Sequence, residues 1–188
     1  MATLQITFVS EDAGYQNTLG WYNKRTGEAG IVFRNTNDDG PHPAITAGAT
    51  ATVNVDQSDI DSGNVGFFLI ANGAEIYGTR PHSVLNGPLS FSTKDNGDGV
   101  IRDASGHKVT GEQGELIFTD KTLNKNDVDY TTDGSGRTAA AIAADQADGI
   151  TGRIAFEDLV KHSDRDFNDL VIDVRVVNAG NRPPVVND

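Results

Sequence analysis

The chain contains no cysteine and only four histidines among its 188 residues. Without cysteine it forms no disulfide and offers no thiolate to a metal or a substrate. Scattered histidines without cysteine also disfavour a zinc site. A domain that works outside the cell without disulfides needs another means of stabilisation, and bound calcium is one candidate.

Long apolar runs are also missing. No stretch approaches the roughly 20 residues of a membrane-spanning helix, so membrane insertion is not expected. The N-terminus lacks the basic region and apolar stretch of a signal peptide. Hydrophobic residues still make up 37% of the chain, which is enough for one folded domain.

Basic residues are scarce, with 15 Lys and Arg against 27 Asp and Glu and a net charge of −12. A nucleic acid would be repelled by such a chain, so we expect no nucleic-acid partner. The acidic residues are mostly Asp, and they cluster with Asn and Gly in predicted turns. Clustered carboxylates repel one another unless a cation neutralises them.

Short apolar or alternating segments, separated by turn residues, predict strands along most of the chain. They favour an all-β fold, an antiparallel β-sandwich with long calcium-binding loops. Asn72-Gly73 predicts a hairpin turn with a returning strand at residues 75–77. The alanine-rich stretch 138–147 is compatible with helix or strand. The expected strands cover residues 4–9, 30–34, 51–55, 65–71, 115–118, 152–156 and 170–177.

The sharpest acidic cluster lies in residues 163–170, just before the last expected strand. Its oxygen-bearing side chains recur at short intervals, which lets them turn toward one point in a loop. Hard oxygen ligands of this kind suit calcium, which accepts six to eight of them. The alternative is that Asp and Asn simply cap a turn. With the upstream acidic pair, the candidate ligands are Glu157, Asp158, Asp164, Asp166, Asn168 and Asp169.

Other acidic segments give weaker signals. Residues 96–101 match the middle of an EF-hand-type loop, but Lys94 and Ser105 stand where ligands belong. A second segment, residues 120–129, is rich in oxygen donors but carries two lysines. Plain turns remain the alternative for both, and Asp56, Asp59 and Asp61 are expected to be solvated turn residues. The further candidate calcium ligands are Asp95, Asp98, Asp103, Asp120 and Asp127.

Catalytic signatures are absent from the sequence. It contains no Gly-x-Ser-x-Gly nucleophile motif and no phosphate-binding glycine loop followed by Lys. Carboxylate pairs of the glycosidase type are available. However, the clustered Asp residues lie in Asn- and Gly-rich turns, which suit cation binding better. We therefore expect a binding or structural domain and not an enzyme.

Three segments resemble a calcium-binding β domain of large repeats-in-toxin (RTX) adhesins, in particular its peptide-binding branch. They are residues 14–22, 65–73, and 156–159 together with 164–169. The resemblance implies a β-rich fold with several calcium ions, exported to the bacterial cell surface. It also implies that the alanine-rich stretch is a strand.

The same resemblance implies binding of peptide or protein ligands on other cells, for adhesion and biofilm formation. The alternatives are a glycan-binding module or a calcium-stiffened spacer. Residues 1–178 would form the domain, monomeric within a long multidomain chain, and residues 179–188, with two prolines, a linker to the next module. The candidate ligand loop contains Asp129, Tyr130, Thr131, Thr132, Asp133 and Gly134.

Overall fold

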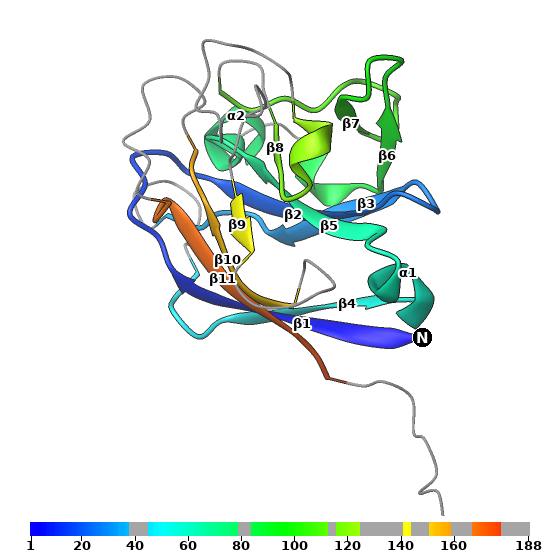
Figure 1. The fold of residues 1–188 in the computed structure, drawn as a ribbon. Coiled ribbons are helices and arrows are strands. Elements are labelled where there is room, and N and C mark those ends of the chain that lie inside the picture. Colours follow the sequence, from blue (N-terminus) through cyan, green and yellow to red (C-terminus); the bar gives the residue numbers. More distant parts are fainter. Residues whose placement is uncertain are drawn as a thin grey trace, which may run out of the picture.

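The computed structural model describes residues 1–37, 45–78, 84–112, 116–124, 151–158 and 167–177, and the backbone of residues 141–143. Within these residues two antiparallel sheets pack against each other, as Figure 1 shows. The chain is thus an all-β sandwich, and the predicted fold class is confirmed.

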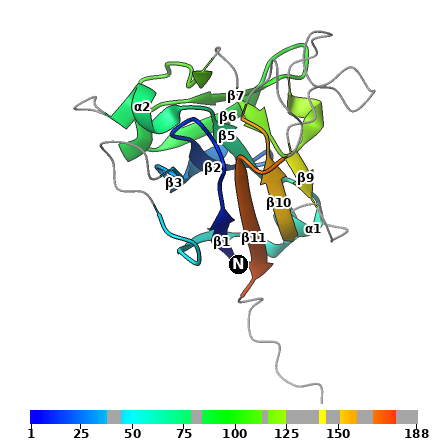
Figure 2. The same cartoon turned by 90° about the vertical axis from the view of Figure 1, so that its left-hand side faces the viewer.

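The first sheet has the strand order β4-β1-β11-β10-β9. In β1 buried and partly exposed residues alternate, as expected for a strand with one face on the core. Figure 2 shows β1, β11 and β10 side by side. The strand β9 lies within the alanine-rich stretch. The bounds are Ala2–Ser10 (β1), Thr50–Val55 (β4), Ala141–Ala143 (β9), Gly152–Phe156 (β10) and Leu170–Val176 (β11).

The second sheet has the strand order β7-β6-β3-β2-β5-β8. Every residue of β5 is buried, which explains why its sequence is continuously apolar. The bounds are Thr18–Asn23 (β2), Glu28–Phe33 (β3), Val65–Ile70 (β5), Leu89–Thr93 (β6), Gly99–Arg102 (β7) and Ile117–Phe118 (β8).

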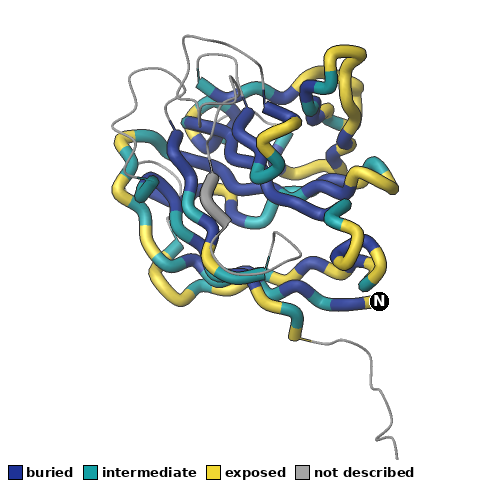
Figure 3. The backbone as a smooth tube through the Cα atoms, in the orientation of Figure 1, coloured by how far each residue is buried: buried dark blue, intermediate teal, exposed yellow. Residues whose placement is uncertain are grey.

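Two apolar clusters cover the two faces of the second sheet. One fills the space between the sheets, with Leu4, Phe67 and Ile172 at its centre. The other lies on the far face, where Phe91 of β6 packs against Phe118 of β8 with ring centroids 6.2 Å apart. Since β6 and β8 are distant in the strand order, this contact means that the sheet curls nearly into a barrel. Figure 3 shows the buried segments in dark blue.

Short helices connect the strands: α1 (Gln57–Asp61), α2 (Gly73–Gly78) and the 3₁₀ helices η1 (Val84–Asn86) and η3 (Lys121–Leu123). The predicted returning strand at residues 75–77 is therefore wrong, because α2 occupies it. Asn72 adopts a left-handed φ of 55° and accepts the amide of Ile76 on its carbonyl. The helix buries Tyr77, whose hydroxyl donates to the carbonyl of Thr110 at 2.8 Å.

Asp59 is also not the solvated turn residue that the sequence suggested. It is 1% exposed and accepts hydrogen bonds from the guanidinium of Arg25 and the amide of Asn23. The hydrogen bonds from Arg25, followed by that from Asn23, lower the pKa of Asp59 to about 2. This contact fixes α1 against the end of β2.

Close approach of β2 and β5 requires glycine at position 20. Gly20 lies opposite Phe68 in the ladder, and a Cβ atom there would overlap the Phe68 ring. Because Phe68 is fully buried, the ring has no free space to move into. We expect Gly20→Ala to destabilise the fold by about 1 to 3 kcal/mol in urea unfolding.

Gly14→Ala is the matched control, since a Cβ at this position meets nothing within 4 Å. It should leave stability within about 0.5 kcal/mol of the parent chain. Equal stabilities of the two variants would contradict the close approach of β2 and β5.

Candidate metal centre

The last hairpin of the first sheet brings three carboxylates together. Strand β10 ends at Phe156 and β11 begins at Leu170, and these two residues are paired. Glu157 and Asp158 therefore leave the sheet beside the point where Asp169 enters it. One carboxylate oxygen from each of the three residues lies within 4.8 Å of the others.

The three acidic side chains are largely removed from solvent. Glu157 is 3% exposed, Asp158 4% and Asp169 9%. One oxygen of Asp169 accepts the backbone amide of Asp158 at 2.7 Å, which ties the two ends of the connection together. Phe167, two residues before Asp169, has a left-handed φ of 52°, an uncommon conformation for an aromatic residue.

The pKa of Asp158 is strongly raised. Burial raises its pKa to about 7, a hydrogen bond from Asn17 opposes the rise, and the charge of Asp169 adds to it. Glu11 contributes a further, smaller repulsion. A carboxylate in these surroundings takes up a proton near neutral pH unless a cation neutralises the cluster.

Asn17 connects this centre to the second sheet. It is 0% exposed and precedes β2. Its side-chain amide donates to Asp158 at 2.7 Å, and its side-chain oxygen accepts the amide of Asn72 at 3.0 Å. Its own carbonyl accepts the amide of Thr36 at 3.0 Å. One buried side chain thus joins the ends of β10 and β5 across the sandwich.

The donor set fits a hard cation. Carboxylate oxygens are the ligands that calcium and magnesium take in proteins, whereas zinc favours histidine and cysteine. Calcium–oxygen distances of about 2.3 to 2.6 Å allow two ligands of one ion to lie up to roughly 5 Å apart. The 4.8 Å spread of Glu157, Asp158 and Asp169 falls within that limit.

Asn168, another predicted calcium ligand, is partly buried and directly precedes Asp169 in the chain. The remaining residues predicted for this region and for the ligand loop lie outside the described residues. They are Asp164, Asp166, Asp127, the proposed ligand loop Asp129, Tyr130, Thr131, Thr132, Asp133 and Gly134, and the linker 179–188.

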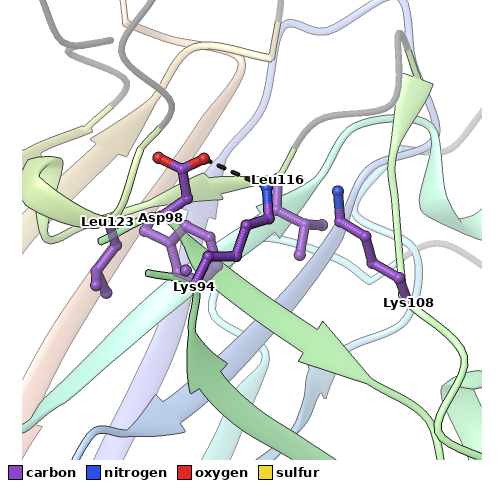
Figure 4. Close-up of a pocket in the computed structure, with 7 residues that line it drawn as sticks. Lys94, Asp98, Lys108, Leu116 and Leu123 are labelled. Atoms are coloured by element: carbon purple, nitrogen blue, oxygen red, sulfur yellow. Dashed lines mark hydrogen bonds and ion pairs between the residues drawn. The ribbon is translucent and has the colours of Figure 1, made fainter. Parts of the chain in front are cut away.

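The predicted calcium loop at residues 94–103 comprises the turn between β6 and β7, the strand β7 and Asp103. Asp98 is buried and its carboxylate pairs with the amino group of Lys94 at 3.3 Å. Lys94 and Lys108 line the same small cavity of about 20 Å³, shown with Asp98 in Figure 4. This volume holds about one water molecule. Two neighbouring ammonium groups disfavour a calcium ion at Asp98.

Two of the remaining candidates make local turn and cap contacts. Asp103 accepts the amides of Ser105 and His107, at 2.9 and 2.8 Å. Asp120 caps η3 and pairs with Lys24 at 2.9 Å. Asp95 is exposed. Within the described part of the chain, none of these residues joins a group of three metal-binding side chains.

Sequence reasoning missed Asn17 and Glu11. Both are distant in sequence from Asp158, and Glu11 has only Asp12 beside it as an acidic neighbour. Tyr15 also lies near this centre. Burial raises the pKa of its hydroxyl, and the charges of Glu112 and Asp158 raise it further.

Fold and site together define an all-β sandwich with a buried acidic centre at one end. The chain belongs to the family described as a domain of unknown function, DUF4114, whose model matches residues 61–177. This range contains the three clustered carboxylates but not Glu11 or Asn17. No curated protein and no solved structure matches the chain.

The matched range begins inside α1, although β1 lies between β4 and β11 in the first sheet. The residues before position 61 are thus part of the same fold. Among the described residues, no helix combines the length and apolar character needed to cross a membrane.

The raised pKa of Asp158 predicts how the metal-free protein responds to pH. The folded value of about 7 lies above the ordinary value of about 3.9, so folding takes up a proton between these pH values. Stability should therefore fall as the pH rises from about 4 to about 7. Asp158→Asn retains an oxygen for Asn17 and removes the charge. In EDTA at pH 8 it should be more stable than the parent by on the order of 2 kcal/mol.

Urea unfolding at pH 5 and pH 8 measures this difference. Asp95→Asn, an exposed carboxylate in the β6–β7 turn, is the control and should keep the pH response of the parent. If Asp158→Asn kept that response too, the carboxylate would not be the group that titrates.

Proposed function

We propose that this domain is a calcium-dependent ligand-binding module of a large bacterial surface adhesin of the RTX type. The observation that carries the calcium part is the convergence of Glu157, Asp158 and Asp169 within 4.8 Å. Three carboxylates give the site a charge of −3 when all are ionised. A divalent cation offsets most of that charge without protonation.

In this proposal Glu157, Asp158 and Asp169 hold the ion. Calcium prefers six to eight oxygen ligands, so further donors are needed. Asp164 and Asp166, in the connection between Asp158 and Asp169, are the proposed additional ligands. The bound ion would supply charge neutralisation and would fix the ends of β10 and β11.

Binding is a better proposal than glycoside hydrolysis for this centre. Glycosidases keep their paired carboxylates about 5 to 9.5 Å apart, so that a substrate or water fits between them. Here the side chains of Asp158 and Asp169 are in hydrogen-bond contact. That arrangement favours a shared proton or a shared cation.

A calcium-stiffened spacer is the second candidate. The contact from Asn17 to Asp158 favours it, because an ion held by Asp158 would be connected directly to both sheets. A spacer needs no ligand pocket. Binding of a peptide or protein ligand therefore separates the two functions.

Calcium should raise the thermal stability of the domain. An ion that binds only the folded state at about 100 times its dissociation constant contributes about 2.7 kcal/mol. For a chain of this length that corresponds to about 5 to 11 °C in Tm. The measurement compares melting in calcium with melting in excess EDTA.

Asp169→Asn and Glu157→Gln should each abolish most of this shift, whereas Asp98→Asn should retain it. An unchanged Tm in EDTA, or an equal loss in Asp98→Asn, would contradict calcium binding at the β10–β11 hairpin.

A further inference from the structure

Strand β2 has a buried asparagine at each end, and each of them donates its side-chain amide to a buried aspartate. Asn17, directly before β2, donates to Asp158 at 2.7 Å. Asn23, the last residue of β2, donates to Asp59 at 2.8 Å. Asp59 also forms an ion pair with Arg25, whereas Asp158 lies in a cluster of carboxylates. What Asn17 does therefore depends on how the charge of the acidic centre is balanced.

The hydrogen bond from Asn17 fixes one oxygen of the Asp158 carboxylate. The amide of Asn17 donates to Oδ2 of Asp158. A carboxylate has two oxygens with about four lone pairs between them, so Asp158 can accept this bond and still bind a cation. Residues that hydrogen-bond to a metal ligand orient it, and their loss typically lowers metal affinity about 10- to 100-fold.

The same asparagine side chain also contacts the start of α2. Oδ1 of Asn17 accepts the backbone amide of Asn72 at 3.0 Å. The carbonyl of the preceding Gln16 accepts the amide of Ala74 at 2.9 Å. The backbone amide of Gln16 donates to Oδ1 of Asn72 at 3.4 Å. Three hydrogen bonds thus join this segment to the turn from β5 into α2.

The turn from β5 into α2 has little room to absorb a shift of Asn17. A Cβ atom at Gly73 would lie 2.7 Å from Oγ1 of Thr18, so the two segments are in close contact. Asn72 holds a left-handed φ of 55°, which few residues other than Gly and Asn adopt. Closely packed interiors transmit strain because they are not compressible. A displacement of Asn17 is therefore passed on to α2.

We propose that Asn17 is a positioning residue of the metal centre and couples cation binding to the turn that begins α2. Asn17 holds the Asp158 carboxylate for the cation, and its contact with Asn72 responds when the cation binds. The coupling is reciprocal, so contacts at α2 that strengthen on binding also raise the affinity for the cation. This inference rests on the proposed function, since it requires a cation at the acidic centre.

The first measurement uses the complete chain without substitution. Calcium is added to the calcium-free protein, and binding is followed by calorimetry and by the chemical shifts of the backbone amides. We expect the amides of Asn72 and Ala74 to shift with the same midpoint as the amide of Asp158. The two backbone amides that donate to the side chain of Asn23, at the other end of β2, should keep their positions.

Asn17→Ala should raise the Kd for calcium about 10- to 100-fold. At saturating calcium the amide of Asp158 should still shift, whereas those of Asn72 and Ala74 should not. Asn23→Ala is the matched control, because it removes a similarly buried asparagine that also donates to a buried aspartate. It should lower stability but leave the Kd for calcium within about twofold of the parent value and all three shifts unchanged.

Calcium binding that leaves Asn72 and Ala74 unshifted in the parent chain would overturn this inference and leave the metal centre intact. An unchanged Kd in Asn17→Ala, or an equal loss of affinity in Asn23→Ala, would overturn it as well. If Asn17→Ala does not fold, the titration of the parent chain decides alone. A parent chain that binds no calcium would overturn the proposed metal centre, and the coupling with it.

Discussion

Mutual repulsion among Glu157, Asp158 and Asp169 is the constraint on which one end of this sandwich depends. A buried carboxylate must form an ion pair, take up a proton or share a cation. Two buried aspartates of this chain, Asp59 and Asp158, differ in how they can meet this requirement. Asp59 is paired with Arg25, which lowers its pKa to about 2. Burial raises the pKa of Asp158 to about 7, and the charge of Asp169 adds to the rise. The fold thus stabilises one buried aspartate internally and leaves the other to be neutralised from outside.

The consequences of this constraint extend to both sheets because Asn17 is bonded to each. Its side chain contacts Asp158 at the end of β10 and the backbone of Asn72 after β5. Whatever neutralises Asp158 therefore acts on the junction between the sheets. It also acts on the segment after β3, since Thr36 donates its backbone amide to the carbonyl of Asn17.

Much of the fold could be predicted from the sequence because its strongest signals are local. Alternation in β1 and the continuous apolar run of β5 both correspond to strands in the structure. The weaker sequence signals gave wrong predictions where tertiary contacts determine the local structure. Asn72-Gly73 has the composition of a hairpin turn, but burial of Tyr77 against the second core favours a helix. The hairpin of β6 and β7 was missed because its strands, of five and four residues, give only a short pattern on either side of an Asn- and Gly-rich turn.

The candidate site was predictable in part for the same reason. Glu157, Asp158 and Asp169 lie close together in sequence and flank two paired strands, so their convergence follows from local pairing. Asp98 has a similar turn composition, but Lys94 and Lys108 lie beside it in space. Asn17 and Glu11 reach the site only through packing of the two sheets. No sequence pattern marks such residues in advance.

A crystal structure of the calcium-saturated domain, recorded with anomalous scattering from calcium or a lanthanide, tests the central claim most directly. The account predicts an anomalous peak about 2.3 to 2.6 Å from oxygens of Glu157, Asp158 and Asp169. It also predicts that Asn17 keeps its contact with Asp158. A structure in saturating calcium without a peak there, and with Asp158 still bonded to Asp169, would contradict the account.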